Sequence, residues 1–248
     1  MARKIDSPLV KQAVWNNNYW IRGTKIIKIF IHHMGANGWT SKRCGEHFKT
    51  AGVSSNYGIG FRGDRTQYVE EKYGAKAQGN LAYNKNGISI EIANSTGAPN
   101  WKVSDESIES CIELVADILI RNKMGRARYT GDLSGNICMH RWVAQTTCPG
   151  KYLGGKFPHI ANECNKIIDG KLRVPERGYF TKDDHGRSVR ILQRFLRKEG
   201  FYTGPYTGDF GTYGSGTIKA VKKFQKKYSL EVDGLFGNEC LKKANKIK

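Results

Sequence analysis

The 248-residue sequence has no run of about 18 consecutive apolar residues, which excludes a conventional membrane-spanning helix. Its first residues, MARKIDSPLVKQ, carry charge but lack the apolar stretch of a secretory signal, so a protein acting outside the cell would have to leave by another route. Helix-turn-helix and zinc-finger spacings are also missing, and we therefore expect no nucleic-acid partner.

Paired cysteines are absent as well. The six cysteines include no CxxC pair, and in a chain of this length they do not indicate a disulfide framework. We expect most of them to be reduced and buried, as free cysteines usually are.

Acidic residues are few relative to basic ones. The chain has 41 Lys and Arg against 22 Asp and Glu, which gives a formal net charge of +19. A surplus of this size indicates an acidic partner: nucleic acid, an anionic membrane surface or an anionic polymer. Only charge points to nucleic acid, since no binding motif accompanies it.

The distribution of apolar residues divides the chain into two regions. Residues 1–170 contain strand patterns interleaved with helical ones, which is typical of an α/β layer architecture. The segment 171–184 is polar, contains Gly and Pro, lacks periodicity and is predicted to be a linker. Residues 185–248 show three short amphipathic helices, and two similar Gly-rich turns, GDFG and DGLFG, predict an internal repeat there.

Three strand patterns and one long helical pattern mark the first region. TKIIKIFIHHM predicts a buried strand ending near His32, and SSNYGIGFRGDRTQYVEE predicts a hairpin around RGDR. NGISIEIANST alternates isoleucines, so Glu91 is expected on the face opposite to them. Ser104 precedes the helical pattern, and Gly125 is its expected stop.

A candidate metal site lies in the stretch CMHRWVAQTTCPG. His140 and Cys148 offer the nitrogen and sulfur ligands that zinc prefers, and Pro149 and Gly150 would fix the chain just after the cysteine. A catalytic zinc has three protein ligands and leaves the fourth position open. The best source of the third ligand is the histidine pair in FIHHM, because a strand end holds a side chain rigidly.

The motifs IFIHH, SSNYGIGF, NGISIEIAN and MHRWVAQTTCPG, in this order and spacing, resemble the type 2 N-acetylmuramoyl-L-alanine amidases, which include phage amidase-type lysozymes and the peptidoglycan recognition proteins. The resemblance covers roughly residues 25–160 and implies a central mixed β-sheet flanked by helices. It places the zinc ligands on His32, His140 and Cys148 and leaves His33 as a neighbour. The implied reaction is hydrolysis of the amide between the muramoyl lactyl group and L-alanine of the stem peptide.

The resemblance also indicates residues for the proton chemistry. Glu91 matches a glutamate that acts as general base in related amidases, and Tyr57 matches a tyrosine near the zinc in others. Thr146 stands where some members have lysine and others threonine. A hydroxyl donates a hydrogen bond but brings no charge, so we place the proton transfer on Glu91 first, with Tyr57 as the alternative.

The carboxy-terminal region resembles a second family. HGRSVRILQRFLRKEGFYTG and GDFGTYGSGTIKAVKKFQKKYSLEVDGLFG are similar to the peptidoglycan-binding domain type 1, a small three-helix wall-binding module. The resemblance covers about residues 185–245, and the helical spacing of its apolar positions predicts that most of them form a core. Cys240 departs from the family, which often has threonine there.

Together the resemblances predict a monomeric, two-domain zinc amidase that binds and lyses the bacterial cell wall. A wall-binding module without a secretory signal is similar to a phage endolysin, which stays in the host cytoplasm until it is released to the wall; a bacterial autolysin is the near alternative. A non-catalytic peptidoglycan-binding protein is the other class, but such proteins typically lose the cysteine ligand, and Cys148 is present. The positive charge would suit anionic teichoic polymers of Gram-positive walls.

Overall fold

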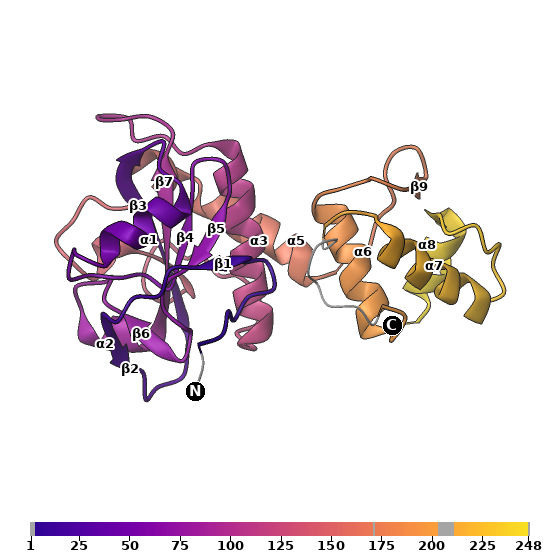
Figure 1. Cartoon of the computed structure of the whole chain (residues 1–248), viewed down its shortest axis with the longest axis horizontal. Helices are drawn as coiled ribbons and strands as arrows, with labels where there is room; N and C mark the ends of the chain where they lie inside the picture. The colour runs from indigo at the N-terminus through magenta and orange to yellow at the C-terminus, as the bar shows by residue number, and fades with distance from the viewer. Residues whose placement is uncertain (1–2, 171, 203–210, 248) are drawn as a thin grey trace. The chain divides into compact units, whose positions relative to one another are not determined.

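The structure is a computed structural model that describes residues 3–170, 172–202 and 211–247. The chain forms two compact units, Met1–Ile168 and Asp169–Lys248 (Figure 1). Each unit has its own hydrophobic core. Within the described ranges, no helix combines the length and apolarity needed to cross a membrane.

A six-stranded mixed sheet forms the centre of the first unit, with the strand order β1-β5-β4-β7-β3-β8. β4 and β5 form an antiparallel hairpin, as predicted, and the other neighbouring strands are parallel. This sheet and its flanking helices confirm the expected fold class. The strands are β1 (Gln12–Ala13), β3 (Lys28–Asn37), β4 (Tyr57–Ile59), β5 (Arg65–Gln67), β7 (Gly87–Asn94) and β8 (Ile137–Met139).

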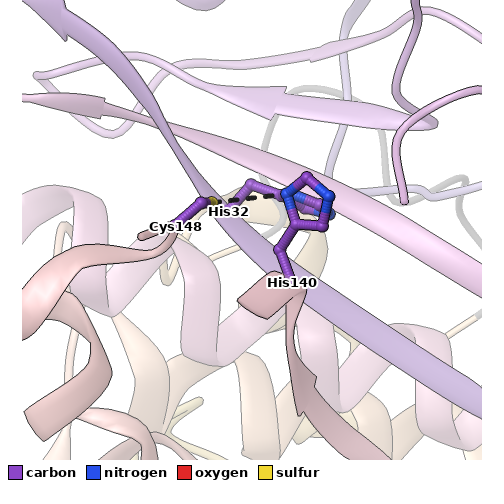
Figure 2. Close-up of side chains that lie close together, drawn as sticks. All are labelled: His32, His140 and Cys148. Atoms are coloured by element: carbon purple, nitrogen blue, oxygen red, sulfur yellow. Dashed lines mark hydrogen bonds between the residues drawn. The ribbon is translucent and has the colours of Figure 1, made fainter. Parts of the chain in front are cut away.

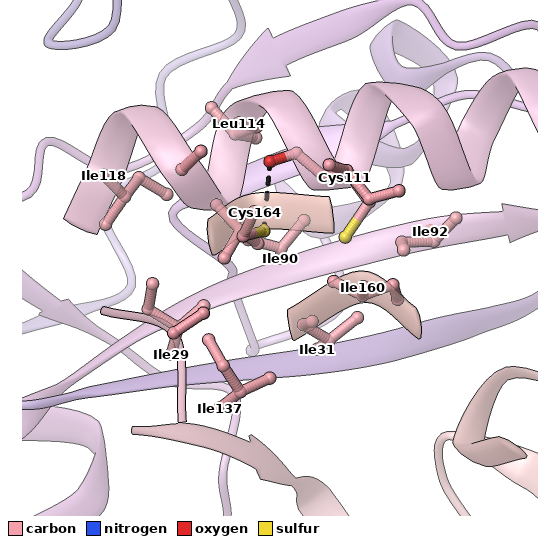
Figure 3. Close-up of a cluster of buried hydrophobic side chains, with 14 of the residues drawn as sticks. Ile29, Ile31, Ile90, Ile92, Cys111, Leu114, Ile118, Ile137, Ile160 and Cys164 are labelled. Atoms are coloured by element: carbon pink, nitrogen blue, oxygen red, sulfur yellow. Dashed lines mark hydrogen bonds between the residues drawn. The ribbon is translucent and has the colours of Figure 1, made fainter. Parts of the chain in front are cut away.

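One face of the sheet carries the main hydrophobic core. Ile29 lies opposite Ile88, and Ile31 opposite Ile90, so these side chains share a face, which α3 and α5 cover (Figure 3). Full burial of each such side chain stabilises the fold by about 1.5–3 kcal/mol. The helical segments of this unit are α1 (Ser41–Phe48), α2 (Leu81–Asn86), α3 (Asp105–Arg121), the 3₁₀ turn η1 (His140–Trp142), α4 (Gly150–Gly155) and α5 (Phe157–Ile168).

The opposite face carries polar side chains and a smaller apolar cluster. His32 lies opposite Glu91 in the β3–β7 register, on the side away from the isoleucines. Cys44 and Phe48 of α1 form the smaller cluster with Tyr68. A separate antiparallel pair, β2 (Tyr19–Ile21) and β6 (Tyr73–Ala75), packs beside α2.

The helix α3 begins at the predicted residue but ends earlier in the chain than predicted. The Ser104 hydroxyl accepts a hydrogen bond of 3.2 Å from the N–H of Ser107, as an N-cap does. The last helical residue is Arg121, whereas Gly125 was the expected stop. Lys123 takes the left-handed conformation at φ 52°, and the N–H groups of Lys123 and Met124 bond carbonyls of the last turn in a Schellman arrangement. A lysine therefore occupies the position that glycine usually takes.

The second unit is a small helical module. Short strands β9 (Tyr179–Phe180) and β10 (Phe236–Gly237) pair antiparallel beside its helices. Leu172 and Phe180 are buried in its core, so the segment 171–184, expected to be a linker, contributes to packing instead. The helices are α6 (Arg187–Lys198), α7 (Ser215–Lys227) and α8 (Asn238–Asn245).

Two buried glutamines brace similar turns in this unit. The side-chain oxygen of Gln193 accepts from the N–H of Gly211 at 2.8 Å, and that of Gln225 accepts from Gly234 at 2.9 Å. Both glycines have a positive φ, which other residues rarely adopt. The repeated brace supports an internal repeat, while residues 208–210 of the GDFG stretch lie outside the described residues.

Candidate metal centre

Three side chains from distant parts of the sequence meet at one edge of the sheet. β3 and β8 are parallel, and their last paired residues are Ile31 and Met139. His32 follows Ile31 within β3, which continues to Asn37, so the strand does not end near His32 as expected. His140 follows Met139 as the first residue of η1, just after β8 ends, and Cys148 reaches both histidines from the loop before α4. One ligand atom from each of the three lies within 4.8 Å of the others (Figure 2). The structure therefore brings together the three residues predicted to be zinc ligands.

The cluster is tightly packed, with His32 and Cys148 buried and His140 partly exposed. His32 is 1% exposed, and its Nδ1 lies 3.7 Å from the Cys148 sulfur. The ring centroids of His32 and His140 are 4.6 Å apart. The Cys148 carbonyl accepts a hydrogen bond from the N–H of Arg141 at 3.0 Å, which ties the cysteine loop to η1.

Burial sets the protonation of all three side chains. It lowers the pKa of His32 well below the usual value, and the neighbouring rings of His140 and His33 add to this. Burial also lowers the pKa of His140, although a hydrogen bond to the Gln78 backbone opposes it. The pKa of the Cys148 thiol is raised by burial. Neutral imidazoles are the form that binds metal, and a divalent cation would displace the thiol proton.

The donor set fits a zinc ion. Zinc binds imidazole nitrogen at about 2.0 Å and thiolate sulfur at about 2.3 Å, so two such ligands on a tetrahedral ion are about 3.5 Å apart. The separation of 3.7 Å between His32 and Cys148 agrees with this value. The Nε2 atom of His140 is buried without a hydrogen-bond partner among the described residues, which leaves this nitrogen available to an ion. Three protein ligands with a fourth position open are typical of catalytic zinc sites.

Glu91 lies beside the three ligands on the same face of the sheet. β7 places it opposite His32, and its Oε1 is 3.9 Å from the Nδ1 of that histidine. Its side chain is 14% exposed, and burial raises its pKa to about 8. A carboxyl group with a pKa near neutrality can both accept a proton and deliver one.

Tyr57 does not lie at this site, contrary to the expectation. It is opposite Ile90 in the β4–β7 register, so its side chain shares the face of the isoleucines, away from Glu91. The fully buried phenol donates a hydrogen bond of 2.7 Å to Glu71, which also pairs with Arg121. Tyr57 is therefore part of the core on the other side of the sheet.

Thr146 and His33 hold the backbone around the cluster. The Thr146 hydroxyl accepts a hydrogen bond from the N–H of Cys148 at 3.2 Å, which fixes the loop that carries the sulfur. The backbone of His33 also hydrogen-bonds Cys148. The His33 ring contacts Trp101 instead of the ligands, with ring centroids 5.8 Å apart, so it is a neighbour of the ligand set, as expected.

Tyr68 and Cys44 form a buried wall near Glu91 that the sequence patterns did not indicate. Gly58 lies opposite Glu91, and a Cβ at Gly58 would sit 1.7 Å from the Tyr68 hydroxyl, so the phenol covers this glycine. Burial and then Cys44 raise the pKa of Tyr68, with a further contribution from Glu91. Gly58 within NYGIG was the one available signal, because a glycine inside a strand often marks the close approach of another group.

Fold and site together define a class of protein. Two histidines and a cysteine on one side of an α/β sheet form a possible three-ligand metal site next to a carboxylate, and catalytic zinc sites of hydrolases use ligands of these types. Residues 22–151, just over half of the chain, match the N-acetylmuramoyl-L-alanine amidase family, and residues 185–243 match a peptidoglycan binding domain. The chain belongs to the N-acetylmuramoyl-L-alanine amidase family.

Individual relatives are similar over parts of their length. N-acetylmuramoyl-L-alanine amidase CwlL of Bacillus licheniformis is 26% identical over 159 residues, which are 62% of this chain and 43% of the relative. The spore cortex-lytic enzyme of Bacillus cereus is 45% identical over 64 residues, 25% of this chain and 24% of the relative. The chain thus covers less than half of either relative. The solved amidase LysC from Clostridium intestinale URNW has a TM-score of 0.46 and 19% identity, covering 62% of this chain and 99% of that one.

Proposed function

We propose that this protein is a zinc-dependent N-acetylmuramoyl-L-alanine amidase that cleaves the amide between N-acetylmuramic acid and L-alanine in peptidoglycan. The observation that carries the proposal is the convergence of His32, His140 and Cys148 beside Glu91 in a chain of the amidase family. The ligands would hold the ion, and Glu91 would handle the protons.

A zinc ion held by these residues would polarise the amide carbonyl and make water more acidic. Glu91 would take the proton of the attacking water and deliver a proton to the leaving amine. Its burial supports this assignment, because the raised pKa, about 8, lets the carboxyl exchange protons near neutral pH. Thr146 has no charge with which to stabilise an oxyanion, and its hydroxyl accepts from the Cys148 backbone, so we assign it to positioning the sulfur.

The second unit would hold the enzyme on the cell wall. Its match to a peptidoglycan binding domain supports peptidoglycan as the partner. The surplus of positive charge adds attraction to anionic wall polymers. We further propose that the protein acts as a monomeric phage endolysin, which reaches the wall from the host cytoplasm; a bacterial autolysin would use the same chemistry.

Purified peptidoglycan provides the direct test. Digestion should release new amino termini on alanine and no new reducing sugars, whereas reducing ends would indicate a glycosidase. A chelator should abolish the amine release, and added zinc should restore it. Full activity of a dialysed, metal-free sample would contradict the zinc assignment.

A non-catalytic peptidoglycan-binding protein is the other class that this chain resembles. The test separates the two, since such a protein would bind the same peptidoglycan and release neither product. His140→Ala provides an internal check, because it removes one ligand and should lower zinc stoichiometry together with the rate.

A further inference from the structure

The second unit has a surface hollow of about 360 Å³ beside the first turns of α7. Two aromatic residues that follow α6 form one wall, and lysines of α7 form the rim. No acidic residue occurs among the described residues that line it. Six of the lining residues are Phe201, Tyr202, Gly216, Lys219, Lys222 and Lys223.

The aromatic wall is held firmly in place. Phe201 packs edge-to-face against Phe224, with ring centroids 5.4 Å apart, and both Phe201 and Tyr202 are only 7% exposed. Gly216 keeps the hollow open next to this wall, since a Cβ there would lie only 3.3 Å from the Tyr202 hydroxyl. The wall therefore offers a preformed apolar surface to a ligand.

The lysine rim carries unbalanced positive charge. Lys219, Lys222 and Lys223 are exposed, and the last two follow Lys219 by three and four residues, so both neighbour Lys219 on the surface of α7. None of them forms an ion pair with a residue in the described ranges. Three like charges at one rim repel one another, and an anionic ligand would relieve that repulsion.

We propose that this hollow binds a carboxylate-bearing residue of the peptidoglycan stem peptide. The aliphatic part of that residue would lie against Phe201 and Tyr202, and its carboxylate would lie among the three ammonium groups. The proposal rests on the proposed function, because it takes peptidoglycan as the ligand. A concave apolar wall favours a peptide over a teichoic phosphate chain, which needs only an exposed basic surface, and over uncharged sugars, which give the lysines no partner.

The experiment measures binding of the full chain to insoluble walls in the Glu91→Gln background, so that the walls stay intact. Three wall samples are compared: whole wall, peptidoglycan freed of teichoic polymer, and glycan strands freed of stem peptides. The test variant carries Lys219→Gln, Lys222→Gln and Lys223→Gln. The control variant carries Lys226→Gln, Lys242→Gln and Lys246→Gln, which removes the same charge from the same unit outside the hollow.

Peptidoglycan without teichoic polymer should still bind the parent chain, and the test variant should bind it at least about tenfold more weakly than the control, at low and at high salt. Gly216→Leu, which fills the hollow without a change of charge, should weaken binding likewise, and thermal melting should show that it folds. Equal losses in test and control variants, loss of binding with the teichoic polymer, or undiminished binding to peptide-free glycan would each overturn the proposal.

The control variant with Glu91 restored should hydrolyse soluble muropeptides at the parent rate. A parent chain that binds walls through the hollow but releases no amine would refute the amidase and leave the binding site intact. Failure of the two proposals is therefore distinguishable.

Discussion

At the scale of single residues, the proposed roles of Glu91 and of the three proposed metal ligands can be tested separately. Glu91 neighbours His32 at 3.9 Å but is not one of the three clustered ligands. Its carboxylate can therefore be altered without removal of a ligand. Metal binding and proton transfer should then respond to different substitutions.

We expect Glu91→Gln to retain zinc and to lose turnover by about 10²–10⁴-fold, because the change preserves shape and removes the proton acceptor. Zinc content per chain measures whether the metal is retained, and the rate of amine release from a soluble muropeptide measures the loss of turnover. Tyr57→Phe is the matched control and should keep its turnover, since Tyr57 lies on the other face. A slow Tyr57→Phe beside a fast Glu91→Gln would reverse the assignment.

The pair of Glu71 and Arg121 should make the first unit sensitive to acid. Burial by itself raises the pKa of Glu71, but the hydrogen bond and charge of Arg121 outweigh it and hold the pKa below its usual value. A carboxyl whose folded pKa is depressed stabilises the fold above its unfolded pKa, and that stability is lost as the pH falls through the folded pKa.

Glu71→Gln should therefore lower the free energy of unfolding at pH 7 by about 1.5–3 kcal/mol, the range for hydrogen bonds to charged groups. Chemical denaturation of parent and variant across the acid range measures the difference, which should shrink as the pH falls below the usual carboxyl pKa. A difference in the free energy of unfolding that does not change with pH would mean that the charges of Glu71 and Arg121 do not stabilise the fold.

At the scale of elements, the end of α3 holds a residue in a conformation that its side chain disfavours. Lys123 has φ 52° at the position after the helix cap, where glycine is usual. The left-handed conformation costs a residue with a Cβ about 1–2 kcal/mol. Glycine would remove this cost, but it would also raise the conformational entropy of the unfolded chain, which offsets part of the gain in stability.

Lys123→Gly should stabilise the first unit by about 0.5–1 kcal/mol after these two effects are combined. Thermal melting of the metal-free protein measures it. The control is Lys166→Gly, an exposed position inside α5, which should destabilise by about 1 kcal/mol. Destabilisation by both changes would contradict the assigned cap.

The strand and helix periods predict most elements, but not how strands face one another. Alternation within NGISIEIAN predicts that Glu91 lies on the other face of the sheet from the isoleucines, and the structure confirms this. The alternation in NYGIG does not predict whether Tyr57 lies on the same face of the sheet as Glu91, because that depends on the register between β4 and β7. The wall formed by Tyr68 and Cys44 is likewise a product of packing between segments, so no local pattern indicates it.

Other features escape prediction because local preference is overridden. The helix α3 ends at Arg121 and not at the glycine that sequence preference favours, because the hydrogen bonds of the cap hold the exposed Lys123 in the left-handed conformation instead. Leu172 and Phe180 belong to a polar, aperiodic stretch that predicts a linker, yet the second unit buries both. By contrast, the resemblance of the motifs around His32, His140 and Cys148 to the amidase family predicted that these three residues lie together, and the structure brings them together.

At the scale of the whole molecule, the chain divides at the boundary between Ile168 and Asp169. Every proposed ligand precedes residue 150, so the first unit should bind zinc and cleave soluble muropeptides by itself. The second unit carries 18 Lys and Arg against 9 Asp and Glu, a net charge of +9 over residues 169–248. Its wall attachment could therefore come from charge or from a specific site.

Salt separates these two causes, since the Debye length shrinks from about 10 Å at 0.1 M to about 3 Å at 1 M. We expect the fragment 169–248 to remain partly on walls at 1 M salt, whereas the fragment 1–168 should wash off. Sedimentation of each fragment with walls at both salt concentrations provides the measurement. The reverse result would mean that the second unit is not the anchor.

The alternation along β7 separates the residues that form the core from the residue proposed to take part in catalysis, so selection can act on each set independently. Ile88, Ile90 and Ile92 face the core, and Ser89 and Glu91 face the other side. Swaps among aliphatic residues of similar volume on the core side cost little. Lineages could therefore drift through many versions of the core while Glu91 stayed fixed, and neighbouring codons in this strand would diverge at very different rates.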